Sequence, residues 1–131
     1  MRTIKFRAKD EKGEWHYGDL EHSPIGKFCR IHEYRNNGFY KWHADVDPDT
    51  VGQFTGLHDV DDTEIYEGDR VFFNDPLNDE RSEATVYWNE TFLRFMLCTG
   101  VGDYDLTDNE ELQLKVIRAP RIMVNANKKP L

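Results

Sequence analysis

The stretch that decides the fold reads Ala84-Thr85-Val86-Tyr87-Trp88-Asn89-Glu90-Thr91-Phe92-Leu93-Arg94-Phe95-Met96-Leu97. Apolar and polar side chains alternate on both sides of Asn89-Glu90-Thr91, and Leu93, Phe95 and Leu97 share one face of the second segment. A period of two residues is typical of strands with one buried face, and the polar residues between the two segments favour a turn. This stretch therefore predicts the clearest β-hairpin in the chain.

The amino-terminal region shows the same pattern. Ile4, Phe6 and Ala8 alternate with charged or polar neighbours, and the alternation resumes after a turn at Asp10-Glu11-Lys12-Gly13. The pattern predicts a second hairpin, in which the alternate positions of the first strand, Arg7 among them, face water.

Shorter segments extend this interpretation. The pattern predicts strands at Cys29 and Ile31, at Phe39, Tyr40 and Trp42, at 70–73, at 114–118 and at 121–124. Asn37-Gly38 suits a tight turn, and Asn74-Asp75-Pro76 is expected to end the strand before it because proline cannot continue a central ladder. Thr107-Asp108-Asn109-Glu110 has capping-box spacing, which predicts one helical turn near 108–113.

The chain shows no linker composition and no internal repeat, so we expect a single domain over residues 1–131. The predicted fold class is mainly β: one compact antiparallel β domain, barrel-like or sandwich-like, with at most one or two short helical turns. The sequence leaves open the choice between barrel and sandwich.

Composition excludes several classes of protein. The 131 residues carry 17 Lys and Arg against 25 Asp and Glu, a net charge of −8, which disfavours a nonspecific binder of duplex DNA. Mean hydropathy is −0.78, and no apolar run approaches the ~18 residues of a membrane-spanning helix. Charges within the first residues predict no secretory signal peptide, and the two cysteines, Cys29 and Cys98, are expected to stay reduced. We therefore expect a cytoplasmic protein with no membrane partner.

Two central blocks carry a resemblance to a known family. They read Val51-Gly52-Gln53-Phe54-Thr55-Gly56-Leu57 and Glu64-Ile65-Tyr66-Glu67-Gly68-Asp69. With Ile4-Lys5-Phe6-Arg7-Ala8 before them and Val116-Ile117, Asn127 and Pro130-Leu131 after them, they resemble the YopX family of bacteriophage and prophage proteins over nearly the whole chain. The sequence departs from the family pattern at Val60-Asp61-Asp62-Thr63 and in its closing run.

The resemblance implies a small β-rich phage protein in the cytoplasm of the bacterial host, able to form homo-oligomers, and it implies no particular molecular function. The family-motif residues, which we expect to be structural, are Gly52, Gln53, Phe54, Thr55, Gly56, Leu57, Ile65, Tyr66, Glu67, Gly68 and Asp69.

Metal and catalytic motifs are incomplete in the sequence. Asp59, Asp61 and Thr63 begin like a calcium loop, but the residues at its sixth and twelfth positions are wrong. His32-Glu33 lacks the second histidine of a zinc-protease helix, and the other histidines show no ligand spacing. The sequence therefore predicts no metal ion and no cofactor.

The remaining polar groups favour structural roles. Tyr66, Glu67 and Asp69 could do acid–base work, but a packed tyrosine beside a turn-capping aspartate is the favoured interpretation. Gly100-Val101-Gly102 is interpreted as a loop between strands instead of a phosphate cradle. We expect no catalytic residue and no enzyme.

Aromatic side chains leave two functional hypotheses. Trp15, Trp42, Trp88, Tyr40 and Tyr87 occur in strands, with Arg35, Lys41 and Arg94 near them. The favoured hypothesis is an interaction module that self-associates and binds a phage or host protein, since such residues are enriched in interfaces. The alternative is that the protein engages nucleic-acid machinery, either by stacking single-stranded bases on its aromatic rings or by mimicking DNA with its acidic surface. The negative net charge disfavours the first of these, direct binding of nucleic acid. Acidic residues in the expected turns between strands are expected to form a solvated rim, with a partner-facing surface as the alternative: Asp45, Asp47, Asp49, Asp59, Asp61, Asp62, Glu64, Asp103, Asp105 and 108–111.

Overall fold

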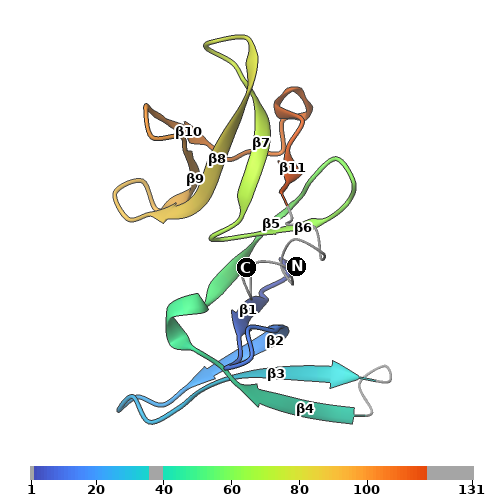
Figure 1. Cartoon of the computed structure of the whole chain (residues 1–131), viewed down its shortest axis with the longest axis vertical. Helices are drawn as coiled ribbons and strands as arrows, with labels where there is room; N and C mark the ends of the chain where they lie inside the picture. Colours follow the sequence, from blue (N-terminus) through green and yellow to red (C-terminus); the bar gives the residue numbers. More distant parts are fainter. Residues whose placement is uncertain (1, 36–39, 118–131) are drawn as a thin grey trace, which may run out of the picture.

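The computed structural model describes residues 2–35 and 40–117, which form two antiparallel sheets (Figure 1). The first sheet has the order β4-β3-β2-β1-β5-β6 and contains β1 (Phe6–Lys9), β2 (Trp15–His22), β3 (Cys29–Arg35), β4 (Tyr40–Asp45), β5 (Gly52–His58) and β6 (Glu64–Tyr66). The second has the order β10-β9-β8-β7-β11 and contains β7 (Arg70–Asp75), β8 (Glu80–Asn89), β9 (Arg94–Cys98), β10 (Asp103–Asp105) and β11 (Lys115–Val116). The expected mainly β, antiparallel fold class is confirmed.

Helical structure in the described ranges is limited to two single 3₁₀ turns, η1 (Pro48–Thr50) and η2 (Glu110–Leu112). The expected helical turn near 108–113 is therefore present, but its cap differs from the prediction. The side chain of Asn109, not Thr107, accepts the hydrogen bond from the Glu111 backbone N–H. Within these same ranges, none of the helical segments has the length and apolar character needed to cross a membrane.

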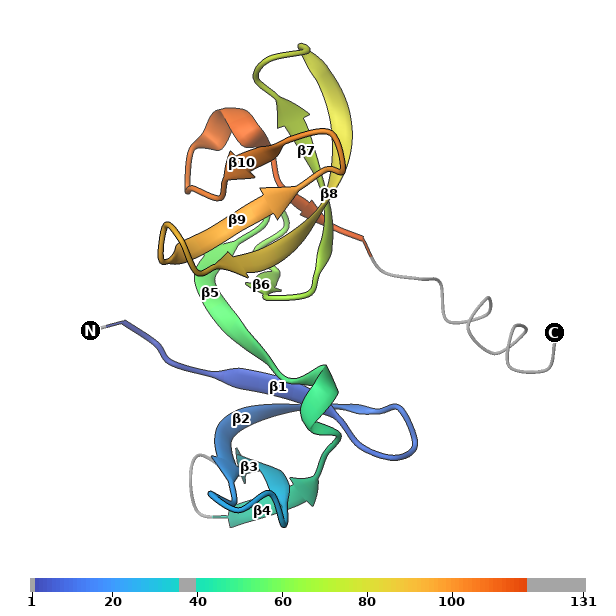
Figure 2. The ribbon, with the colours of Figure 1, turned by 90° about the vertical axis from the view of Figure 1, so that its left-hand side faces the viewer.

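Strands β1 to β4 lie toward one end of the molecule and β7 to β11 toward the other, and β5, with β6 beside it, runs from the first group toward the second (Figures 1 and 2). At one end β5 pairs with β1, and along its length it pairs with β6, which leads into β7. Each end has its own buried cluster. The first contains Ala8, Ile31 and Val46; the second contains Ile65, Val71, Phe73, Ala84, Val86, Leu97, Leu112, Leu114 and Val116.

The first hairpin is confirmed, with one correction. β1 and β2 pair as predicted, and the Gly13 N–H donates to the Asp10 carbonyl in the turn between them. Arg7, however, is buried instead of facing water, because β1 has neighbours on both faces and Asp69 supplies a counter-charge. Ile4 lies before the strand and is exposed.

The hairpin that decides the fold is also confirmed, with a longer turn than expected. β8 and β9 pair from Thr85↔Cys98 to Asn89↔Arg94, and residues 90–93 form the turn. Leu93 therefore belongs to the turn and does not share the strand face of Leu97. β7 continues through Asp75 and ends before Pro76. The expected Asn37-Gly38 turn, Phe39 and the 121–124 strand lie outside the described residues.

Candidate functional site

The two motif blocks meet around the buried side chain of Arg7. Its Nη2 lies 2.9 Å from Asp69 Oδ1, and both side chains are more than nine-tenths buried. The guanidinium also lies over the rings of Trp15, 4.2 Å from its centroid, and Tyr66, 5.0 Å away. The other oxygen of Asp69 accepts a hydrogen bond from the Tyr66 backbone N–H at 2.8 Å. This Arg7 junction thus ties β1 to the turn between β6 and β7.

Glycine is required where the two blocks touch. A Cβ on Gly52 would lie 2.4 Å from the carbonyl oxygen of Glu67, closer than van der Waals contact allows. The close approach lets the Glu67 N–H donate to the Gln53 carbonyl at 2.9 Å. Gly68 has φ +94°, a left-handed conformation that side chains disfavour, and it lies beside the Arg7 guanidinium.

The hydroxyl of Tyr66 and the carboxylate of Asp69 have different partners. The phenol donates to Glu64 at 2.9 Å, and Glu64 pairs with Lys5 at 2.7 Å. Burial and the bond to Glu64 raise the pKa of Tyr66 well above its usual range, which keeps the phenol protonated. Tyr66 and Asp69, which the sequence also allowed as acid–base groups, thus take part in a framework of internal hydrogen bonds.

The other motif residues serve the same framework. The Phe54 and Tyr66 rings lie 5.5 Å apart, and the Thr55 hydroxyl donates to the Ile65 carbonyl at 2.8 Å. Ile65 is fully buried in the second cluster, against which Leu57 packs. A structural role for the motif residues stays a prediction, which the variant Gly52→Ala tests.

A second feature is the exposed apolar tip of the β8–β9 hairpin, which we call the hairpin tip: Trp88, Phe92, Leu93, Arg94 and Phe95. Trp88, Phe92 and Leu93 are 41%, 59% and 70% exposed. The Trp88 and Phe95 rings pack edge to face at 5.0 Å, and the Arg94 guanidinium lies 5.2 Å from the Phe92 centroid. A shallow groove of about 380 Å³ runs beside the tip.

The turn holds the tip in a defined conformation. Asn89 Oδ1 accepts from the backbone N–H groups of Thr91 and Phe92, both at 2.9 Å, and the Leu93 N–H donates to the Asn89 carbonyl at 2.8 Å. Leu93 has φ +55°, a costly conformation for a residue with a branched side chain. The hairpin thus presents two large apolar side chains to solvent on a strained turn that three hydrogen bonds to Asn89 hold in place.

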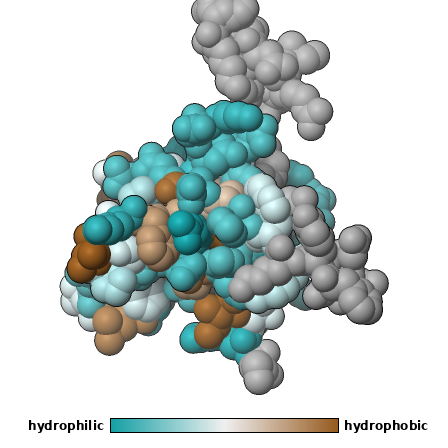
Figure 3. Space-filling view, turned by 90° about the horizontal axis from the view of Figure 1, so that it is seen from below, coloured by the Kyte–Doolittle hydropathy of each residue, from teal (hydrophilic) through white to brown (hydrophobic). Residues whose placement is uncertain are grey.

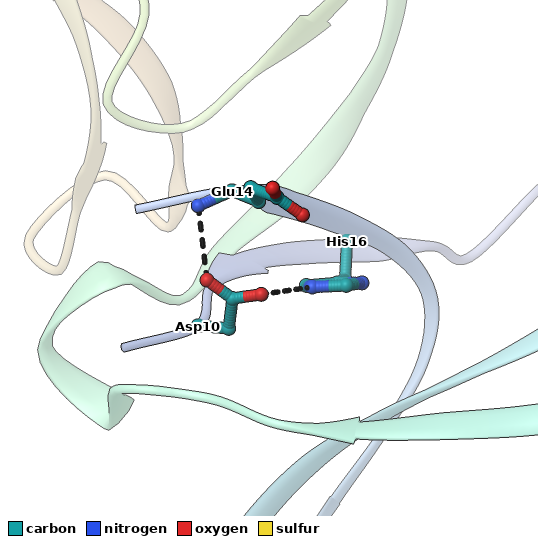
Figure 4. Close-up of side chains that lie close together, drawn as sticks. All are labelled: Asp10, Glu14 and His16. Carbon is teal, nitrogen blue, oxygen red and sulfur yellow. Dashed lines mark hydrogen bonds and ion pairs between the residues drawn. The ribbon is translucent and has the colours of Figure 1, made fainter. Parts of the chain in front are cut away.

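A third feature is a cluster at the first hairpin that the sequence did not predict. Asp10, Glu14 and His16 each place one oxygen or nitrogen within 4.8 Å of the others (Figure 4). Asp10 Oδ2 lies 2.8 Å from His16 Nε2, and Glu33 on β3 lies 2.9 Å from Nδ1. Among the described residues, these are the groups whose chemistry best suits a metal ion.

The protonation of this cluster follows from its contacts. Burial opposes charge on the His16 ring, but the hydrogen bonds to Asp10 and Glu33 outweigh it and raise the pKa of His16 above 6.5. The bond to His16 also lowers the pKa of Asp10. The cluster could have been found in the sequence from the predicted turn, because a turn at 10–13 brings positions 10, 14 and 16 to one end of a hairpin.

The remaining candidates from the sequence have structural partners. Asp59 Oδ1 accepts from the N–H groups of Asp61 and Thr63, and its Oδ2 accepts from Val116, so the calcium-like loop is an acidic turn tied to β11. Gly100-Val101-Gly102 forms the turn between β9 and β10, closed by Thr99.

The aromatic residues do not form one surface. Trp15 lies on Arg7, and Trp42 packs against His16 with centroids 5.4 Å apart. The Tyr87 hydroxyl donates to Asp103 at 2.6 Å, and only Trp88 of this set joins the hairpin tip. The side chains of Arg35, Tyr40 and Lys41 lie outside the described residues.

Acidic residues are not all part of a solvated rim. Asp59, Asp69 and Asp75 are buried and bond backbone or side-chain donors. The surface seen from below the first sheet is nevertheless mainly hydrophilic, with separate small apolar areas (Figure 3).

Comparison with known proteins agrees with the resemblance seen in the two central blocks. A search of curated proteins finds no match. The family model described as YopX protein matches residues 5–118, a range that begins just before β1 and includes β11, both motif blocks and the Arg7 junction. The chain therefore belongs to the YopX family.

Proposed function

We propose that this chain is a phage or prophage accessory protein that acts in the cytoplasm of the bacterial host as a non-enzymatic interaction module. In this proposal the hairpin tip mediates self-association into homo-oligomers, and the assembled protein binds a phage or host protein. The observation that carries the proposal is the exposure of Phe92 and Leu93 on an ordered turn.

Physical arguments support the tip as the contact surface. Burying two large apolar side chains stabilises an interface by about 1.5–3 kcal/mol each, and an ordered turn avoids most of the entropy cost of fixing them. Trp88 and Arg94 add the residue types that most often dominate binding energy. The motif residues, by contrast, are engaged in contacts within the chain.

Self-association is tested by size-exclusion chromatography with light scattering at micromolar concentration. We expect an oligomer for the unmodified chain and a monomer for the Phe92→Ser/Leu93→Ser variant. Val101→Ser is the matched control, because Val101 is 92% exposed in the next turn but lies outside the tip. A monomeric unmodified chain, or equal dissociation of the control, would contradict the proposal.

A second candidate function is binding of single-stranded nucleic acid at the same end of the molecule. It is favoured by the groove beside the tip, where Arg2 lies with the rings of Trp88 and Phe95, together with Arg94, which is paired with Asp105 at 2.9 Å. Bases stack on aromatic rings, and each stacked base contributes about 1–3 kcal/mol.

Titration with labelled single-stranded and duplex DNA at several salt concentrations separates the two functions. Binding of single strands that weakens steeply with salt and is lost in Trp88→Ala supports the second candidate. Absence of binding to either DNA leaves protein contact as the function, including contact with a DNA-binding enzyme through the acidic surface.

A further inference from the structure

We propose that Asp10, Glu14 and His16 form a binding site for Zn²⁺. The three side chains come from one hairpin, since Asp10 precedes the turn, Glu14 follows it and His16 lies in β2. They offer two carboxylate oxygens and one imidazole nitrogen within 4.8 Å of one another, so that a small movement of the exposed Glu14 side chain would let one ion contact all three (Figure 4). Three protein ligands of this kind with open positions are typical of zinc sites that also bind water.

Glu33 gives the ring the orientation that a metal ligand needs. It lies 2.9 Å from His16 Nδ1, so the opposite nitrogen, Nε2, faces Asp10. In metal sites the histidine nitrogen that does not bind the ion usually donates its proton to a carboxylate, which fixes the tautomer. The His16 side chain is only 10% exposed and packs against Trp42, so its position is set before any ion arrives.

The electrostatic balance of the cluster favours a cation. Three carboxylates, those of Asp10, Glu14 and Glu33, face one imidazole. The adjoining groove, of about 780 Å³, adds more acidic than basic side chains, since Glu11 and Asp47 line it with Lys12, while Asp45 is paired with Arg30. A proton on Nε2 offsets one of these negative charges, whereas a divalent ion in its place offsets two.

The donor atoms favour Zn²⁺ over Ca²⁺, Mg²⁺ and Mn²⁺. An imidazole nitrogen disfavours Ca²⁺ and Mg²⁺, which prefer oxygen ligands alone. Zn²⁺ accepts nitrogen and oxygen together, and for such sites its affinity exceeds that of Mn²⁺. Glu14 is exposed at the mouth of the groove, which leaves room for water to complete the coordination.

The test is calorimetric titration of the full-length protein with Zn²⁺ after dialysis against a chelator. We expect one equivalent to bind, with the stoichiometric binding abolished in Asp10→Asn and in His16→Gln. Glu33→Gln is expected to weaken binding by about 10- to 100-fold, as carboxylates behind a metal-bound histidine do. Mn²⁺ should bind more weakly than Zn²⁺, and Ca²⁺ should not compete.

Two further variants keep the result decisive. Glu14→Gln alters an exposed side chain, so a loss of Zn²⁺ affinity there cannot be ascribed to unfolding; circular dichroism checks the fold of every variant. His32→Gln is the matched control, because His32 also pairs with a glutamate, with Nε2 2.7 Å from Glu21, but lies outside the cluster. Absence of stoichiometric Zn²⁺ binding, binding retained in His16→Gln, or binding lost in His32→Gln overturns the proposal.

Discussion

Arg7 is the residue on which the two ends of the molecule meet. Its charge is buried between two aromatic rings and paired with Asp69, whose other oxygen bonds the backbone. A buried ion pair adds little net stability by itself, because desolvation offsets the attraction. Removing one partner, however, leaves the other charge buried and uncompensated. The fold therefore requires that Arg7 and Asp69 both be present and in contact.

Arg7→Met tests this requirement. We expect the free energy of unfolding, measured by urea denaturation, to fall by about 3–5 kcal/mol because Asp69 loses its counter-charge. Arg70→Ala is the control, since the Arg70–Glu83 pair is half exposed and its loss is expected to cost about 1 kcal/mol or less. Equal losses in the two variants would contradict the account.

Gly52→Ala tests the contact between the motif blocks. The added methyl group collides with the Glu67 carbonyl oxygen, and the backbone must move to relieve it. We expect a loss of about 1–3 kcal/mol in the free energy of unfolding. Gly102→Ala meets open space, so its change is expected to stay within about 0.5 kcal/mol. A harmless Gly52→Ala would show that the close approach is not needed.

At the scale of elements, two turns of the second sheet have different roles. The β7–β8 turn is held by Asp75, which accepts from the N–H groups of Leu77 and Asn78 and from the Tyr104 hydroxyl. The β8–β9 turn is held by Asn89 and places Leu93 at positive φ. The first arrangement stabilises the fold, whereas the second places a strained apolar residue in solvent, which a stability requirement alone does not explain.

Leu93→Gly is expected to separate stability from association. Glycine relieves the positive φ but adds freedom to the unfolded chain, so the free energy of unfolding should stay unchanged or rise by up to about 1 kcal/mol. Light scattering should show weaker self-association, because the apolar side chain is gone. A variant that is clearly less stable, or that associates as well as the unmodified chain, would contradict this role.

Asp75 predicts a specific sensitivity to acid. Burial raises the pKa of this carboxyl group, but its hydrogen bonds outweigh burial and hold the pKa below the usual 3.8. The stabilising contribution is therefore fully present above about pH 3.8 and is lost as the pH falls through the lower, folded-state pKa.

Urea denaturation between pH 2 and pH 6 measures this effect. The free energy of unfolding should decrease less steeply on acidification in Asp75→Asn than in the unmodified chain. Tyr104→Phe, which removes one of the hydrogen bonds, should lie between the two. Identical acid dependence in all three proteins would show that Asp75 is not a main contributor.

At the scale of the whole molecule, sequence periodicity predicted the strands and hairpins better than the contacts between residues far apart in the sequence. Both hairpins follow from side-chain alternation, which is a local property. The burial of Arg7 could not be predicted, because its partner Asp69 lies far along the chain. The grouping of His16 with Glu33 likewise depends on how β2 pairs with β3, and the role of Leu93 depends on a turn longer than expected.

The expectation of a single domain leads to a prediction about cooperativity. Because β5 pairs with β1 and continues toward the second sheet, we expect both buried clusters to unfold together. Two single-tryptophan variants report on the two ends by fluorescence. One keeps Trp42 as its only tryptophan, and the other keeps Trp88. Their urea transitions should coincide. Separate midpoints would show two independently folding units.

The order of Arg7 and Asp69 along the chain has a consequence for synthesis on the ribosome. Asp69 is added about 60 residues later, which takes about 3–12 s at ~5–20 residues/s. During that time β1 can pair with β2, and later with β5 of the first motif block, but the guanidinium has no counter-charge. We expect the edge of β1 that β5 later covers to be open to pairing with other chains until the first motif block is made, and the Arg7 side chain to remain hydrated until Asp69 is made.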